Sequence, residues 1–473
     1  MLPFRLAALA LAASPGLALP PAAAPELAPL FQDHAVLQRE KPVPVWGRAA
    51  PGEHVSVSFA GQTVGATAGP EGRWIAVLAP LAENASGADL TVGGKTASVT
   101  LHDIVVGEVW LCSGQSNMEF AVDDGSPAYR VDNAAAEVAA ARYPLIRHFK
   151  VARQAAPVPM ESAPGEWSPC SPQTVGRFTA VGYFFARDLF VRLGVPIGIV
   201  NSTWAGTPIE AWMSPAALAS VPGSPGGRSF AGADPRGGDP SAPSSLFNGM
   251  IQPLLPYAIR GAVWYQGEGD AGRAPLYALQ FPALINAWRS HFGEGDFPFL
   301  WVQLANFSPK GEGPADQWAY LREAQARALA LPSTGQAVAI DIGDPANMHP
   351  RNKREVGRRL ALIAKAEVYS IPVDYSGPVF SSATGEGPAI RVQFRFAADG
   401  LTASGRPLQS FEVAGADRVF HPASAAIRGD SVIVRSPAVA QPVAVRYAWR
   451  NAPDANLYNG AGLPAAPFRS DDW

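Results

Sequence analysis

The chain has 473 residues and a formal net charge of −3, from 37 Lys and Arg against 40 Asp and Glu. This length predicts two or three domains and is sufficient to bury an enzyme core. The near-neutral balance, with no basic stripe, argues against a nucleic-acid partner, and the two cysteines exclude a disulfide-rich scaffold and a cysteine-rich zinc module.

Residues 1–24 have the features of a secretory signal peptide. Arg5 precedes a short apolar run, Leu6–Ala13, and small residues follow at Ala22–Ala24. An unstructured tail rich in Ala and Pro is the alternative. Only six of the 37 basic residues are Lys, a ratio typical of GC-rich bacterial genomes, so we expect a bacterial protein that is secreted or periplasmic. No later stretch reaches the about 18 apolar residues of a membrane anchor.

The two ends of the mature chain are expected to form β-rich domains. Residues 25–102 contain short segments in which apolar and polar residues alternate, such as His54–Phe59, and this pattern predicts a β-sandwich. Similar runs return in residues 371–473, at Ile390–Phe394 and Ser431–Val434. The N-terminal region contains no catalytic cluster.

Residues 103–370 alternate apolar strands with helical segments, which predicts a doubly wound, flavodoxin-like α/β domain with a parallel five-stranded sheet. The Gly/Pro/Ser-rich segment 220–245 is expected to be a mobile surface loop near the strand ends. The five expected strands are Val105–Cys112, Pro196–Asn201, Arg260–Tyr265, Phe299–Leu304 and Ala337–Asp341, and the clearest helices are Pro275–Phe292 and Lys353–Tyr369.

A candidate nucleophile follows the first of these strands. Ser116 lies in the sequence GQSNM, on a tight strand-to-helix turn that holds its hydroxyl outward and places backbone N–H donors beside it. Serine is a weak nucleophile alone, so a base must lie within hydrogen-bond reach. For the pentapeptide by itself, a serine that caps the helix is the simpler interpretation.

His349 is the candidate base among the seven histidines. It lies in the loop DIGDPANMHP (Asp341–Pro350), between the last expected strand and the last helix. Ligand and catalytic groups of open α/β sheets gather at the carboxyl ends of the strands. This position and the nearby carboxylates favour catalysis over the surface or capping role that is ordinary for a single histidine.

Two more polar clusters follow the second and third strands, NSTWAGT at Asn201–Thr207 and WYQGE at Trp264–Glu268. Side-chain amides and backbone N–H groups in such loops can stabilise the oxyanion of acyl transfer. Gln266 is equally suited to be a buried amide that bonds loop backbone, and Glu268 to be a structural partner of an arginine.

Further segments extend the pattern along the chain. They are Phe31–Arg39, Gly107–Phe120, Leu246–Ile251, His349–Pro350 with Asn352–Lys353, Asn456–Asn459 and Gly462–Arg469. Together with the clusters above, in this order, they resemble the sialate O-acetylesterase family of the SGNH/GDSL hydrolase superfamily. The resemblance covers nearly the whole mature chain, and it implies an SGNH-hydrolase fold for the α/β domain.

The resemblance also implies residue roles. Ser116 matches the family nucleophile and His349 its general base. The oxyanion hole would consist of the backbone N–H groups of Ser116 and Gly206 and the side-chain amide of Gln266. The residues expected to support the site or contact substrate are Gln115, Asn117, Asn201 and Glu268, with Arg322 as a further support.

The chain departs from the family at the catalytic acid. Relatives carry an aspartate two or three residues before the histidine, where positions 346–347 are Ala and Asn here. We expect Asp344 to orient the imidazole and stabilise its cation. Asp341, Glu268 or a backbone carbonyl are the alternatives. A second departure, Gly269–Asp270 in place of Ser-Asn, leaves a role for the aspartate open.

The sequence therefore predicts a serine esterase that removes O-acetyl groups from carbohydrates. The resemblance points to sialic acids, and acetylated xylan or another polysaccharide is the close alternative. A non-catalytic carbohydrate-binding protein is the alternative from another class. Metal-ligand spacings and phosphate-binding glycine loops do not occur, so no cofactor is expected. Cys112 and Cys170 are compatible with a disulfide or with free thiols, and nothing specifies an oligomeric state.

Overall fold

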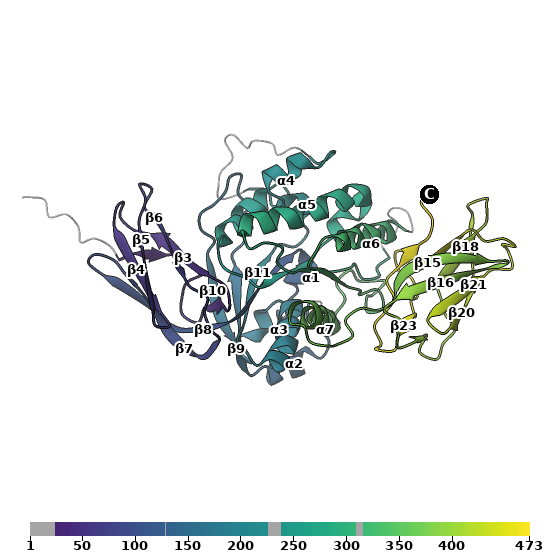
Figure 1. Ribbon diagram of the computed structural model, residues 1–473, viewed down its shortest axis with the longest axis horizontal. Helices are drawn as coiled ribbons and strands as arrows, with labels where there is room; N and C mark the ends of the chain where they lie inside the picture. Colours follow the sequence, from purple (N-terminus) through teal and green to yellow (C-terminus); the bar gives the residue numbers. More distant parts are fainter. Residues whose placement is uncertain (1–23, 128, 226–237, 309–315) are drawn as a thin grey trace, which may run out of the picture.

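The structure, a computed structural model, describes residues 24–127, 129–225, 238–308 and 316–473. Three parts follow one another along the long axis of the molecule (Figure 1): β-strands at the N-terminal end, a layered α/β region in the middle, and β-strands at the C-terminal end. The predicted signal peptide lies outside the described residues up to position 23.

A central β-sheet holds the strands whose ends carry the polar clusters. Its strands, in the order in which they lie side by side, are Gly165–Cys170 (β10), Tyr143–Val151 (β9), Ile197–Thr203 (β11), Ser98–Gly114 (β8), Gly261–Tyr265 (β12), Phe299–Val302 (β13) and Thr334–Ala337 (β14). β10 is antiparallel to β9, and every other neighbouring pair in this order is parallel.

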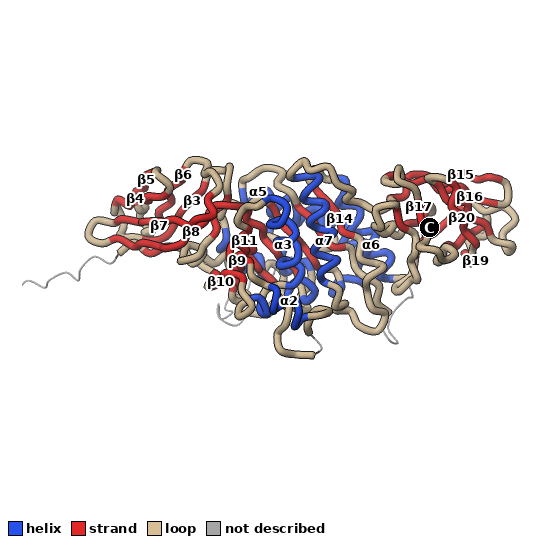
Figure 2. The backbone as a smooth tube through the Cα atoms, turned by 90° about the horizontal axis from the view of Figure 1, so that it is seen from below, coloured by secondary structure: helices blue, strands red, loops and turns tan. Residues whose placement is uncertain are grey.

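Helices cover both faces of this sheet. Ala180–Leu193 (α3) and Lys353–Ile363 (α7) lie on one face, and Ala274–Phe292 (α5) and Gln317–Arg327 (α6) lie on the other (Figures 1 and 2). Indole rings of the strands pack against phenyl and indole rings of the helices, for example β8 against α3 and β12 against α5. The predicted α/β class is confirmed. The shorter α-helices are Ser116–Glu119 (α1), Ala134–Ala140 (α2) and Pro215–Ser220 (α4).

The prediction of a five-stranded sheet is wrong, because β9 and β10 extend the sheet beyond β11. Arg147 and His148 interrupt the apolar pattern of β9, although both side chains are buried. The Arg147 guanidinium bonds the Asp103 carboxylate at 2.9 Å, and the His148 ring stacks on Phe178 with centroids 4.6 Å apart. Such pairing offsets the cost of burying polar groups, and hydrophobic periodicity does not reveal it.

The last strand ends earlier than predicted. β14 has β13 as its neighbour in the sheet, and because β13 ends at Val302, the paired part of β14 ends at Ala337 rather than Asp341. The apolar residues after Ala337 do not extend this strand. Ile340 and Val338 pack into the hydrophobic core of the C-terminal β-strands, so the apolar run connects two cores.

One strand joins the N-terminal β-strands to the central sheet. β8 is 17 residues long; it pairs antiparallel with Asn84–Gly93 (β7), and further along it pairs parallel with β11 and β12. The predicted domain boundary between residues 102 and 103 therefore lies inside a continuous strand. The other strands of this part are Glu26–Leu27 (β1), Val36–Gln38 (β2), Val43–Arg48 (β3), His54–Phe59 (β4), Gln62–Thr67 (β5) and Arg73–Leu78 (β6).

The C-terminal strands pack around a core of their own. One sheet contains Val379–Glu386 (β15), Ala389–Arg395 (β16), Ser431–Arg435 (β21) and Ser424–Arg428 (β20), and a second contains Phe420–Pro422 (β19), Phe411–Ala414 (β18), Ala444–Tyr447 (β22) and Phe468–Arg469 (β24). Leu401–Thr402 (β17) pairs with Tyr458–Asn459 (β23). Arg322 of α6 attaches this part to the central region, because its buried guanidinium donates to carbonyl oxygens of Leu304, Ala305, Arg450 and Asn451.

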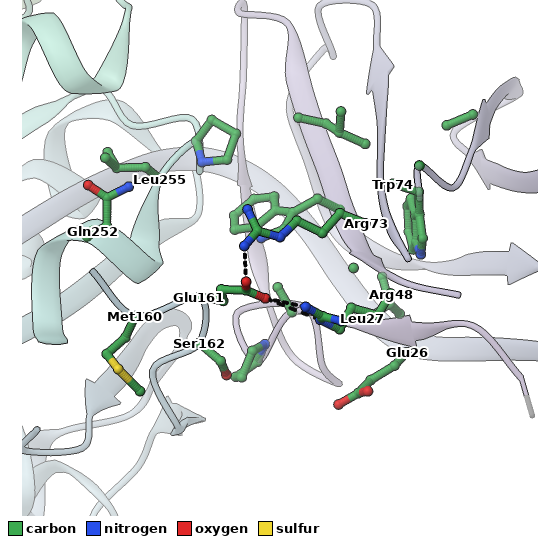
Figure 3. Close-up of a pocket in the computed structure, with 18 of the residues that line it drawn as sticks. Glu26, Leu27, Arg48, Arg73, Trp74, Met160, Glu161, Ser162, Gln252 and Leu255 are labelled. Atoms are coloured by element: carbon green, nitrogen blue, oxygen red, sulfur yellow. Dashed lines mark hydrogen bonds and ion pairs between the residues drawn. The ribbon is translucent and has the colours of Figure 1, made fainter. Parts of the chain in front are cut away.

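A cavity of about 910 Å³ lies between the N-terminal strands and the central region (Figure 3). Glu161 forms ion pairs across it with Arg48 and Arg73. None of the residues from the polar clusters at the strand ends lines this cavity.

Both cysteines are buried free thiols. The disulfide that the sequence left open is thus absent, and burial raises the pKa of the Cys112 and Cys170 thiols to about 12. Of the expected surface loop 220–245, residues 226–237 lie outside the described part. Within the described ranges, no helix combines the length and the apolar character needed to cross a bilayer.

We expect Glu108 to be the most costly carboxylate to remove from the junction between β8 and its neighbours. Its buried side chain accepts hydrogen bonds from Arg39 at 2.5 Å and from Arg260 at 2.6 Å. Glu108→Ala leaves these two cations without their shared anion and should lower the free energy of unfolding by about 3–5 kcal/mol, measured by urea denaturation. The exposed partner of Arg39 provides the control: Glu83→Ala should cost less than about 1 kcal/mol. Equal losses would contradict this account.

Candidate active site

The four polar clusters meet at one edge of the central sheet, where its parallel strands end. Ser116 begins α1 directly after β8, Gly206 follows β11, Gln266 follows β12, and His349 lies between β14 and α7. Because parallel strands point the same way, loops that are distant in sequence come together at this edge.

The hydroxyl of Ser116 is hydrogen-bonded to the imidazole of His349. Oγ lies 2.8 Å from Nε2, although 233 positions separate the two residues. Both residues are partly exposed. The turn before the serine depends on Gly114, which has a φ of 131° and where a Cβ would lie 2.2 Å from the carbonyl oxygen of Tyr265. Glycine therefore permits the close passage of β8 and β12.

The side-chain amide of Asn117 connects three loops. Its Nδ2 donates to Glu268 Oε1 at 2.5 Å and to the carbonyl oxygen of Met348 at 2.9 Å, and its Oδ1 accepts from Lys353 Nζ. Met348 directly precedes the histidine of the Ser–His pair. The amide thus fixes the histidine loop relative to the serine turn.

Lys353, the first residue of α7, has no exposed surface. Its ammonium lies 4.8 Å from the ring centroid of Phe120 and 5.4 Å from that of Tyr265, distances at which aromatic faces attract a cation. Burial lowers the pKa of Lys353 to about 7, and the charge of Glu268 acts in the opposite direction. Burial raises the pKa of Glu268, while its bond from Asn117 and the charge of the lysine lower it.

Among the described residues, no carboxylate pairs with His349. Asp344, the predicted acid, is exposed, and its Oδ1 accepts from a backbone N–H of its own loop at 2.8 Å. Asp341 is held by Arg359 through two bonds of 2.6 and 2.8 Å. Glu268 is engaged by the amide network. The geometry does not place Asp344 in the role predicted for it, because turn formation uses its carboxylate locally.

The surroundings of His349 favour its neutral form. Burial and, secondly, the positive charge of Lys353 lower the pKa of the imidazole to about 4. The ring of Tyr129 lies beside it, with centroids 5.6 Å apart. At neutral pH the imidazole is therefore uncharged, and one of its nitrogens can accept a proton from Ser116.

Gln266 has a different place from the one predicted. Its Nε2 donates to the carboxylate of Asp270 at 2.5 Å and to the carbonyl oxygen of Thr207 at 3.2 Å, which uses both N–H groups of the amide. The side chain is fully buried. Asp270 Oδ2 also accepts from the backbone N–H of Ile209 at 3.0 Å. Gln266 and Asp270 thus hold the loop that carries Gly206, and no donor of the amide remains for an oxyanion.

The backbone N–H groups of Ser116 and Gly206 have no acceptor within the described part of the chain. Gly206 has a φ of 75° and is exposed, with open space where a side chain would be. Two donors of the predicted set of three, the backbone N–H groups of Ser116 and Gly206, therefore remain unpaired among the described residues.

The other predicted supporting residues are buried and already paired. Gln115 Oε1 accepts from the backbone N–H groups of Gly267 and Gly269, at 3.4 and 3.3 Å. Asn201 Oδ1 accepts from Lys150 Nζ at 2.9 Å. Both side chains position neighbouring groups, and Arg322 acts at the C-terminal junction instead.

Comparison with known proteins identifies the family. A family model described as carbohydrate esterase, sialic acid-specific acetylesterase, matches residues 106–365, which is more than half of the chain. The chain belongs to this family. It is accordingly a carboxylic ester hydrolase, and the resemblance seen in the sequence is confirmed.

Relatives extend this result beyond the matched residues. The sialate O-acetylesterase of Rattus norvegicus is 32% identical over 412 residues, which cover 74% of each chain, and that of Homo sapiens is 33% identical over 382 residues, which cover 73% of this chain and 71% of the human one. A crystal structure of a carbohydrate acetylesterase from Xanthomonas citri is 44% identical, with a TM-score of 0.87, and covers 95% of this chain and 100% of the other.

The sequence did not single out Lys353 as part of the site of this esterase. A lysine at the start of a helix is ordinarily solvent-exposed. A usable signal was its position: four residues after the histidine, and one after Asn352, whose side chain accepts from the backbone N–H of Glu355 at 3.2 Å and so starts α7. Lys353 directly follows this cap, and its side chain is buried.

We expect the imidazole of His349 to titrate near pH 4, well below its ordinary pKa of 6.5. Lys353→Met removes the neighbouring positive charge and should raise this pKa toward 6.5. NMR of histidine-labelled protein measures it, with His349→Gln to assign the resonance. Lys365→Met, which removes a lysine paired with Asp188, is the matched control. A pKa of 6.5 in the unmodified protein, or an equal shift in the control, would refute the expectation.

Proposed function

We propose that this carbohydrate acetylesterase removes O-acetyl groups from sialic acids, with Ser116 as nucleophile and His349 as general base. The observation that carries the proposal is the 2.8 Å contact between Oγ and Nε2 at the partly exposed edge of the sheet. The family match and the sialate O-acetylesterase relatives support the choice of substrate.

In the first half of the reaction, Ser116 Oγ attacks the acetyl carbonyl carbon while His349 Nε2 takes the hydroxyl proton. The carbonyl oxygen becomes an oxyanion, which accepts hydrogen bonds from the backbone N–H groups of Ser116 and Gly206. When the tetrahedral intermediate collapses, His349 gives its proton to the departing sugar oxygen. The sugar leaves with a free hydroxyl, and an acetyl group remains on the serine.

In the second half, water replaces the sugar. His349 takes a proton from the water as it attacks the acetyl-serine, and the same backbone donors hold the second oxyanion. Collapse returns the proton to Ser116 Oγ and releases acetate. Because burial and the charge of Lys353 lower the pKa of His349 to about 4, the imidazole is in its neutral, proton-accepting form at neutral pH. Asn117 and Lys353 keep the ring in place through the histidine loop.

Ser116→Ala should lower acetate release from O-acetylated N-acetylneuraminic acid by about 10⁴-fold or more, because it removes the hydroxyl that is bonded to the imidazole of His349. Ser113→Ala is the control: this serine lies three positions earlier in β8, and its buried hydroxyl has no partner in the described chain. Full activity in Ser116→Ala would exclude Ser116 as the nucleophile.

The same assay tests the substrate. It is run on the O-acetylated sialic acid, on acetylated xylan and on 4-nitrophenyl acetate with the unmodified enzyme. The O-acetylated sialic acid is expected to give a higher kcat/KM than acetylated xylan. A preference for acetylated xylan would show that the substrate is a neutral polysaccharide and would leave the proposed roles of Ser116 and His349 unchanged.

Gln266 and Asp270 are expected to act as one unit that positions Gly206. Gln266→Ala and Asp270→Ala should each lower kcat by up to about 10²-fold through displacement of the oxyanion donor, and the double variant should cost little more than either single change. Steady-state kinetics on 4-nitrophenyl acetate measures all three. If Gln266→Ala alone cost 10²–10³-fold and Asp270→Ala nothing, the amide would instead be a direct oxyanion donor.

A further inference from the structure

Two basic side chains lie at the end of β9, one inside the strand and one just beyond it, on the far side of the Gly206 loop from the histidine. The sheet order places β9 next to β11, and β11 next to β8, which leads into Ser116. Lys150 is at the end of β9 and Arg153 lies just beyond it. The carboxyl edge of the sheet thus carries, in order, a basic pair, an oxyanion loop and the nucleophile.

The basic pair is held by one carboxylate. Glu119 Oε1 accepts from Arg153 Nη2 at 2.8 Å and lies 3.6 Å from Lys150 Nζ. Lys150 also donates to Asn201 and Thr203, each at 2.9 Å. Two cations therefore face a single anion, which leaves the cluster with an excess positive charge.

Arg153 retains free hydrogen-bonding capacity. Nε and Nη2 bond Glu119, whereas Nη1 has no acceptor within the described ranges. Half of its side-chain surface is exposed, 50% against 18% for Glu119. The guanidinium carbon lies 5.4 Å from the ring centroid of Trp204, an indole that is only partly buried. A charged donor and an apolar ring thus lie together at the surface.

This cluster is directly connected to the reacting groups. Glu119 follows Ser116 by three positions in α1, a spacing that puts two side chains on the same side of a helical turn. Its second oxygen, Oε2, accepts from the backbone N–H of Ala205 at 2.9 Å. Ala205 is the residue between Trp204 and Gly206. The carboxylate of Glu119 therefore links Arg153 to the loop that carries Gly206.

We propose that Arg153, beside Trp204 and supported by the charge of Lys150, binds the carboxylate of the sugar whose acetyl ester Ser116 cleaves. The inference rests on the proposed function, and it names the group by which this enzyme distinguishes acidic from neutral acetylated sugars. A guanidinium donates to a carboxylate with charge-assisted hydrogen bonds. The indole offers an apolar surface to the C–H groups of a sugar ring.

The test compares the same acetylated sugar with its carboxylate free and with that carboxylate neutralised as a methyl ester. Acetate release is measured on O-acetylated N-acetylneuraminic acid, on its carboxyl methyl ester and on 4-nitrophenyl acetate, for the unmodified enzyme, Arg153→Gln and Arg153→Lys. Arg48→Gln is the matched control, because Arg48 has 49% side-chain exposure and binds Glu161 through the same two nitrogens, at 3.2 and 2.6 Å.

We expect Arg153→Gln to lower kcat/KM for the free acid by at least about tenfold, mainly through a higher KM, since a hydrogen bond to a charged group is lost. Activity on the methyl ester and on 4-nitrophenyl acetate should change less than about threefold. The unmodified enzyme should prefer the free acid to its methyl ester, Arg153→Gln should lose that preference, and Arg153→Lys should recover part of it. Arg48→Gln should behave as the unmodified enzyme.

Two results would overturn the inference. If Arg153→Gln lowers activity equally on the acid and on its methyl ester, the side chain does not recognise the charge, and the proposed function remains. If the unmodified enzyme cleaves 4-nitrophenyl acetate but not the O-acetylated sialic acid, both the inference and the sialic acid substrate fail.

Discussion

The carboxamide of Asn117 is the interaction on which the site depends. It bonds a carboxylate after β12, a backbone carbonyl of the loop after β14 and the ammonium at the start of α7, and it stands next to Ser116 itself. These hydrogen bonds fix the three loops relative to one another. Hydrogen bonds to charged groups are the stronger kind, so this buried network has the strength to hold an imidazole in place.

Electrostatics at the strand ends follow from that network. The buried ammonium of Lys353 lies near the rings of Phe120 and Tyr265, and its charge adds to burial, the larger cause, in lowering the pKa of His349. On the other side of the serine, Glu119 pairs with the partly buried Lys150 and the exposed Arg153. The two sides of Ser116 therefore differ in exposure: the ammonium of Lys353 is fully buried, whereas the guanidinium of Arg153 is half exposed.

The sequence was sufficient for those features that depend on local patterns. The polar clusters that follow the strands, the tight turn before Ser116 and the loop of His349 could be read directly, and the topology of parallel strands explains why the two side chains meet. Features that depend on partners distant in sequence were missed. β9 was hidden because Arg147 and His148 are buried against Asp103 and Phe178. The family resemblance gave the amide of Gln266 an oxyanion role, whereas its bonds to Asp270 and Thr207 fit the alternative of a buried amide that bonds loop backbone.

The single length of β8 has a consequence for truncation of the chain. Its N-terminal half belongs to the outer β-strands and its C-terminal half ends at the turn before Ser116. The two halves meet at an irregular step of the ladder between Leu101 and Ile104, where Asp103 has a φ of 56°. The outer strands are therefore continuous with the strand that leads to Ser116, and shortening the chain from its N-terminal side up to position 103 would remove residues 98–103 of β8.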